Sequence, residues 1–238
     1  CMKEVTRLGV PALLVALLRS ASRAVAAAAE EALAALSQRG GEPTRRAVAE
    51  AMKTGGGLPL LTELLDDADS GVSSASRAAL LIDGVAMQSA EARATLVELG
   101  AVPKLVAMLD AGPAVKGGDD STSVDDALGA LESICTGGNV DAQDAAREAG
   151  VMAKLAPLLT AGAASAHSRS NAVLALSSLV RRNEASASAA RAAGLVEMVA
   201  ALLDEGAASE IAQLAALALQ SLGLLTIDKA DLTLRKLG

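Results

Sequence analysis

A chain of 238 residues with a formal net charge of -7 and no Phe, Trp or Tyr already excludes several functions. Nucleic-acid binding draws on clustered Lys and Arg and on aromatic rings that stack on bases, so this composition argues against a nucleic-acid partner. Hydrophobic residues make up 52% of the chain, which argues against disorder and predicts a core of aliphatic side chains.

A ten-residue pattern recurs five times, and its clearest copy is GAVPKLVAML at residues 100–109. The other copies are LGVPALLVAL (8–17), GGLPLLTELL (56–65), GVMAKLAPLL (150–159) and GLVEMVAALL (194–203). The proline slot falls at positions 11, 59, 103, 153 and 197, and a period in the forties is typical of stacked helical repeats. Pro11, Pro59 and Pro103 suit the first turn of a helix, where a missing N–H costs nothing.

In chain order, a helix on the ten-residue pattern is followed by a longer Ala/Leu-rich helix in each unit, and a short polar helix precedes most copies of the pattern. The first unit covers residues 1–39, with its long helix at about 22–37 and a Gly-Gly stop at 40–41. The next four units are predicted at residues 42–88, 89–137, 139–182 and 184–225, and a tail follows at 226–238. Together they form one elongated domain over residues 1–238.

One connection departs from this order. The segment AGPAVKGGDDST at residues 111–122 is longer than usual for a link between helices, and its Gly and Asp residues predict a mobile surface loop. The segment is either a tolerated insertion that points into water or a functional loop that contacts a partner or serves regulation. Ser123 and Asp126, which follow it, have the spacing of a capping box at the start of the next helix.

The order of a short helix, Gly-x-(Val/Ile)-Pro-x-Leu-Val-x-Leu-Leu, and a long helix ending in Ala-Leu-x-x-Leu resembles the armadillo repeat over nearly the full length. The resemblance implies an all-α, right-handed α-solenoid of about five three-helix repeats. In the armadillo family the third helices of the repeats line a concave groove, and peptides bind there along a ladder of Trp and Asn side chains.

The ladder positions in this chain carry neither residue. Aligned on the Ala-Leu-x-x-Leu ending, the Trp slots hold Glu31, Leu80, Gly129, Leu174 and Leu217, and the Asn slots hold Ala35, Gly84, Ser133, Ser178 and Ser221. The family's grip on the backbone of an extended basic peptide is therefore not expected. Small residues predict instead a smooth channel for an amphipathic helix or for aromatic anchors of a partner. The alternative is that they only let neighbouring helices pack tightly, and Gly84 within a helix predicts such a close approach.

The sequence offers no catalytic, cofactor or metal site. His167 is the only histidine, and Cys1 and Cys135 have no metal-like spacing, so we expect neither an enzyme nor a metal protein. The absence of a disulfide pattern favours the cytoplasm or another reducing compartment, and import into an organelle stays open. The most apolar window, residues 211–227, contains polar residues where a third helix is expected, so no membrane span is predicted.

These observations favour a non-enzymatic protein-interaction module, as a scaffold, an adaptor or a structural subunit of a larger complex, with its partner in the concave groove. A helical-repeat carrier or lyase-like protein for a small molecule or pigment is the alternative. That alternative needs charged groups converging on a ligand, and only Glu31 is charged in the ladder. A nuclear transport adaptor is disfavoured because the Trp and Asn ladder is missing.

Overall fold

The computed structural model describes residues 4, 7–66, 72–111, 121–160, 164–205 and 209–224. Within these ranges the chain forms fourteen α-helices and two short 3-10 helices, and no strand. This confirms the all-α solenoid. Most of the predicted loop (112–120) and the tail (226–238) lie outside the described residues.

The helices recur in groups of three, as first, second and third helices of each repeat. The first helices are α4 (Glu42–Thr54), α7 (Ala90–Glu98), α10 (Val140–Glu148) and α13 (Glu184–Ala192). The second helices are α2 (Val10–Leu17), α5 (Gly57–Leu64), α8 (Ala101–Met108), α11 (Val151–Leu159) and α14 (Leu195–Ala201), and η2 (Leu109–Ala111) and η3 (Leu202–Glu205) extend α8 and α14. The third helices are α3 (Arg23–Arg39), α6 (Val72–Gln88), α9 (Ser121–Cys135), α12 (Ala166–Val180) and α15 (Glu210–Ser221).

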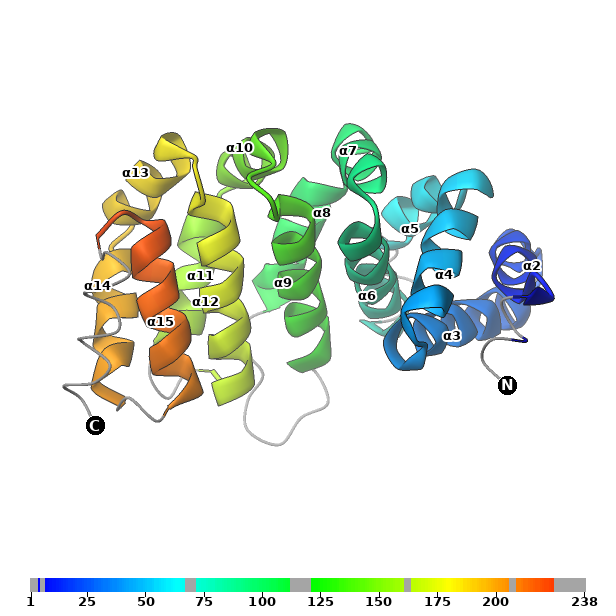
Figure 1. Cartoon of the computed structure of the whole chain (residues 1–238), viewed down its shortest axis with the longest axis horizontal. Helices are drawn as coiled ribbons and strands as arrows, with labels where there is room; N and C mark the ends of the chain where they lie inside the picture. The colour runs from blue at the N-terminus through cyan, green and yellow to red at the C-terminus, as the bar shows by residue number, and fades with distance from the viewer. Residues whose placement is uncertain are drawn as a thin grey trace.

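Successive repeats stack along one direction, so that α2 and α15 lie at opposite ends of the molecule (Figure 1). The third helices α9, α12 and α15 stand side by side in one layer, and α8, α11 and α14 form the layer behind them. The first helices α7, α10 and α13 run across one end of these two layers. The third helices therefore present one continuous face.

A left-handed glycine turns the chain from the first helix into the second. Its φ is 67° at Gly56, 75° at Gly100, 80° at Gly150 and 71° at Gly194, a region that is strained for any residue with a Cβ. This explains why Gly recurs in the pattern and why α5 begins two residues before Pro59. In the first unit the left-handed residue is Gly9, one position closer to its proline than in the other copies.

Polar side chains cap the start of three first helices. The side-chain oxygens of Ser89, Asn139 and Asn183 accept hydrogen bonds from backbone N–H groups three residues further on. Such caps stabilise a helix by about 1 kcal/mol each. They stabilise the corners that lead from α6 to α7, from α9 to α10 and from α12 to α13.

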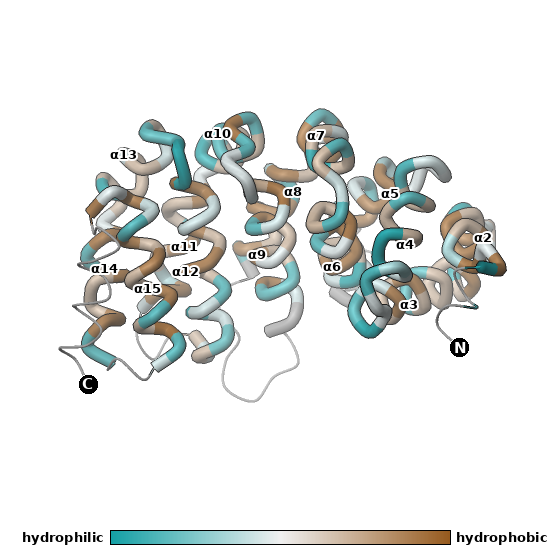
Figure 2. Tube along the Cα trace, viewed as in Figure 1, coloured by the Kyte–Doolittle hydropathy of each residue, from teal (hydrophilic) through white to brown (hydrophobic). Residues whose placement is uncertain are grey.

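An aliphatic core runs the length of the solenoid. Leu33, Leu81, Leu128 and Leu176 are buried on the third helices, and hydrophobic and hydrophilic segments alternate along the helices in Figure 2. Repeats contact only their neighbours, so no bulky aromatic filler is needed. Cys135 is also buried there, and burial raises the pKa of its thiol to about 12.

Ion pairs join the second helices of successive repeats. Lys104 Nζ lies 2.6 Å from Asp66 Oδ2, and Lys154 Nζ lies 2.6 Å from Asp110 Oδ2. Both lysines follow the proline slot by one residue, so the repeat pattern also sets the spacing of these contacts.

In the described ranges no single helix is long and apolar enough to cross a membrane, and only α13 with α14–η3, bent by 77°, meets the length and composition test as a pair.

Candidate functional site

Hydrogen bonds between side chains join each third helix to the next. From α6 to α3, Ser74 Oγ donates to Glu30 Oε2 at 3.0 Å, and from α12 to α9, Ser168 Oγ donates to Asp125 Oδ2 at 3.2 Å. Between α12 and α15, the hydroxyls of Ser177 and Ser221 lie 2.9 Å apart. These contacts hold the third helices in register, and they bring side chains of five repeats onto one face.

The pair α6 and α9 is joined by two carboxylates. Ser76 donates from α6 to Asp126, and Ser133 donates from α9 to Asp83. The donor and the acceptor are 50 residues apart in both cases. Both carboxylates are thereby fixed at the edge of the space between the two helices.

This space is a hollow of about 670 Å³, bordered by residues of α3, α4, α6, α9 and α12. We call it the acidic hollow, because Asp83, Asp125, Asp126 and Glu132 line it, while Glu42 and Arg45 at its border form an ion pair with each other. Among the described residues no Lys or Arg nitrogen comes within 4.0 Å of these four carboxylates. Their hydrogen-bond partners in the structure are neutral, namely serine hydroxyls and the Asn171 amide.

The acidic hollow makes ionisation of its carboxyl groups unfavourable. Burial, helped by the charges of Asp125 and Asp83, raises the pKa of Asp126 to about 6 against the hydrogen bond from Ser76. Burial also raises the pKa of Asp83 and of Glu132, and Asp83 adds to the effect on Glu132. A cationic group that entered the hollow would relieve this repulsion, and clustered groups with shifted pKa values are a common mark of functional sites.

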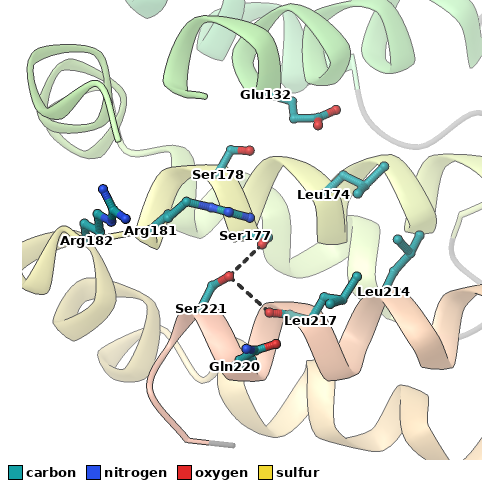
Figure 3. Close-up of a pocket in the computed structure, with 10 residues that line it drawn as sticks. All are labelled: Glu132, Leu174, Ser177, Ser178, Arg181, Arg182, Leu214, Leu217, Gln220 and Ser221. Atoms are coloured by element: carbon teal, nitrogen blue, oxygen red, sulfur yellow. Dashed lines mark hydrogen bonds between the residues drawn. The ribbon is translucent and has the colours of Figure 1, made fainter. Parts of the chain in front are cut away.

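A second hollow of about 410 Å³ lies between α12 and α15, with Glu132 of α9 at its edge (Figure 3). Leu174, Leu214 and Leu217 form its apolar wall, and Arg181 and Arg182 supply positive charge. We call it the arginine hollow. Because Glu132 lines both hollows, the two adjoin, and together we call them the third-helix groove.

The arginine pair follows the end of α12 in a fixed conformation. Gln143 Nε2, from α10, donates to Ser178 O at 2.7 Å and to Arg181 O at 3.0 Å, which satisfies carbonyls at the helix end. Arg182 has a φ of 59°, and it is the only left-handed residue other than glycine in the described ranges. This conformation costs about 1 kcal/mol or more for a residue with a Cβ.

The structure places eight of the ten predicted ladder residues in the two hollows. Leu80, Gly84, Gly129 and Ser133 line the acidic hollow, and Leu174, Ser178, Leu217 and Ser221 line the arginine hollow. Glu31, exposed on α3, and Ala35, half-buried on the same helix, line neither of them.

Several of the small ladder residues contact neighbouring helices. Ser133 is 6% exposed and Ser178 is 7% exposed, so little of either side chain reaches solvent. A Cβ on Gly84 would lie 3.1 Å from Ser37 Oγ of α3, which identifies the close approach at this glycine. These contacts favour tight packing at the three positions, whereas Leu217, 54% exposed, offers surface to a partner.

Sequence reasoning missed the charged residues of the groove. Asp83 and Glu132 each precede an Asn slot by one residue. Aligning the residues one position before each Asn slot would therefore have revealed these two carboxylates. The capping-box interpretation of Asp126 was wrong, because α9 begins at Ser121 and Asp126 accepts a hydrogen bond from Ser76 instead. The arginine pair carried no signal, because it lies beyond the aligned helix ending.

Within the described part of the chain, no group of three or more His, Cys, Asp or Glu side chains is placed to hold a metal ion. His167 is exposed, and its Nε2 lies 3.2 Å from the Asn171 amide.

Comparison with known proteins identifies the fold. No family model and no curated protein matches the chain. A designed armadillo repeat protein in complex with the peptide (KR)4 matches at a TM-score of 0.72 and 26% identity, over 93% of this chain and 85% of that one. A computationally designed armadillo repeat protein for modular peptide recognition matches at 0.70 and 26%, over 95% and 87%. An engineered protein matches at 0.71 and 28%, over 89% and 78%.

The chain therefore has an armadillo-like repeat fold, built as an all-α solenoid. This fold commonly serves as a protein-binding scaffold and is typically non-enzymatic.

Proposed function

We propose that this chain is a non-enzymatic protein-interaction module that binds a Lys- or Arg-bearing segment of a partner protein along the third-helix groove. The observation that carries the proposal is the acidic hollow, where four of the five lining carboxylates, those of Asp83, Asp125, Asp126 and Glu132, make no ion pair within 4.0 Å among the described residues. The designed neighbour in complex with (KR)4 supports the same choice of partner chemistry.

The side chains of the partner segment, and not its backbone, would make the binding contacts. A ladder without Trp and Asn cannot clamp an extended backbone in the way the armadillo family does. Cationic heads can instead approach Asp83, Asp126 and Glu132 while their aliphatic stems lie over Leu80 and Met87, which is 65% exposed. Each pair formed in this partly exposed setting contributes about 0.5–1 kcal/mol, so several cationic residues are needed for micromolar binding.

We include in this proposal that the module works as a subunit or adaptor within a larger complex, in the cytoplasm or another reducing compartment. The buried free thiol of Cys135 is compatible with such a compartment.

Binding of a fluorescently labelled (KR)4 peptide, measured by polarisation at low and at physiological salt, tests the function. The double variant Asp83→Asn with Glu132→Gln removes two charges, and Asn at position 83 keeps an acceptor for Ser133. Affinity should fall about 5- to 30-fold, which is about 1–2 kcal/mol. The fold should persist, as checked by circular dichroism.

The matched control is Glu63→Gln with Glu98→Gln, which removes two exposed charges from α5 and α7, outside both hollows. Affinity should then change less than twofold. Equal losses in the two double variants would mean that the peptide senses only net charge. That result, or no binding at all, would refute the proposed function.

A further inference from the structure

The arginine hollow differs in charge from the acidic hollow beside it. Arg181 and Arg182 line it, and in Figure 3 the Arg181 side chain extends over α12 toward the middle of the hollow. In the described part of the chain neither guanidinium makes a hydrogen bond or an ion pair within 4.0 Å, whereas Arg147, Arg169 and Arg191 all pair with carboxylates. The charge of Arg181 lowers the pKa of Glu132 against the larger effect of burial, without an ion pair within 4.0 Å.

The conformation of Arg182 shows that its side chain is not needed for the turn. Arg182 directly precedes the helix cap Asn183, and Gly138 holds the same place before Asn139 with a φ of 77°. Glycine fills this left-handed position without strain, whereas arginine is strained there at a φ of 59°. A strained residue with an unpaired, exposed charge beside a hollow is a candidate for a binding role.

We propose that the third-helix groove binds a partner segment that carries both charge signs, with Lys or Arg in the acidic hollow and Asp or Glu on Arg181 and Arg182. This inference rests on the proposed function and names the partner's chemistry more closely. A purely cationic segment would place positive charge against the arginine pair, which is unfavourable. The two ends of the groove thereby give the bound segment one direction.

The dimensions of the groove set the spacing of these charges. Neighbouring helices pack about 8–10 Å apart, and the two hollows lie one or two helix spacings from each other. The distance between the hollows is therefore about 10–20 Å. An extended segment advances about 3.3 Å per residue, which places the acidic residue about three to six positions from the basic block. An aliphatic residue beside the acid would meet Leu174, Leu214 and Leu217.

Three labelled peptides of equal length test the inference. The first has a Lys-Arg-Lys-Arg block, a Gly-Ser-Gly spacer and Leu-Glu-Glu; the second ends in Leu-Gln-Gln; the third places Leu-Glu-Glu before the spacer and the basic block. Measured by polarisation against the intact chain, one of the two acid-bearing peptides should bind at least fivefold tighter than the neutral one. The opposite order should lose this gain.

The variant Arg182→Gly isolates the role of the guanidinium. It should leave the thermal midpoint unchanged or raised, and it should keep the affinity for the neutral peptide within twofold. It should abolish most of the increase in affinity that the two Glu residues of the acid-bearing peptide provide. Arg39→Gln removes an exposed arginine that lines neither hollow, and it should keep the full gain. In Arg182→Glu the preference should reverse toward a peptide that ends in Leu-Lys-Lys.

Equal affinities of the acid-bearing and neutral peptides would overturn this inference and leave the proposed function standing. A gain that survives in Arg182→Gly would do the same. Absence of binding by all three peptides would overturn both proposals.

Discussion

Ionisation of Asp126 in the acidic hollow should destabilise the fold as the pH rises, and the variant Asp126→Asn should not show this loss of stability. The pKa of this carboxyl lies at about 6, against an ordinary value of 3.8, because it is buried near Asp125 and Asp83. A group whose pKa is raised on folding contributes stability below the pKa of the unfolded chain. That contribution is lost as the pH rises through the pKa of the folded state.

The size of the effect follows from the two pKa values. A difference of about 2 pH units corresponds to about 3 kcal/mol at 1.36 kcal/mol per unit, and partial exposure of Asp126 reduces this to about half. Most of the change falls between pH 4 and pH 7.5. In that window the stability of Asp126→Asn should improve relative to the unmodified chain by about 1 kcal/mol.

Urea unfolding followed by circular dichroism at several pH values measures this difference, because the chain has no aromatic residue for intrinsic fluorescence. Asp204→Asn, which removes one carboxyl at an exposed position of η3 outside both hollows, is the control. A stability difference for Asp126→Asn that stayed constant from pH 4 to pH 7.5 would show that the hollow does not hold the proton on this carboxyl.

Four further outcomes are expected. The affinity for (KR)4 should fall about fivefold from pH 7.5 to pH 5 at constant ionic strength, about 1 kcal/mol, and this dependence should flatten in Asp126→Asn, as polarisation would show. Gly100→Ala should lower the free energy of unfolding by about 1 kcal/mol through backbone strain alone, since its φ is 75° and a Cβ would meet nothing within 4 Å; urea unfolding checks this. Ser133→Leu should destabilise the fold by about 1–3 kcal/mol, because it overfills a buried site and removes a donor to Asp83, and an unchanged thermal midpoint would contradict this. Cys135 should resist iodoacetamide at pH 8 in the folded protein and react in urea, as mass spectrometry would detect.

The sequence alone determined the architecture, because the features that specify it are local and repeated. Gly-x-x-Pro turns, helical periodicity and Ala-Leu endings each act within one or two helices, and each recurs at a spacing that only stacked repeats explain. Gly100 illustrates the strength of this signal, since its recurrence in the pattern reflects a left-handed turn in every unit. For the same reason, the helix ends predicted from the sequence lie within a few residues of the helix ends in the structure.

The character of the groove was decided only in the tertiary structure. Asp83 meets Ser133, and Asp126 meets Ser76, across 50 residues of sequence, and these contacts exist only after two repeats have stacked. Burial of a carboxyl, and therefore its pKa, depends on the same stacking. Stacking of the repeats also buries Ser133 to 6% exposure and leaves Leu217 54% exposed, although both occupy ladder slots. Local sequence specifies which helices form, whereas the surface that faces a partner depends on how neighbouring repeats are oriented.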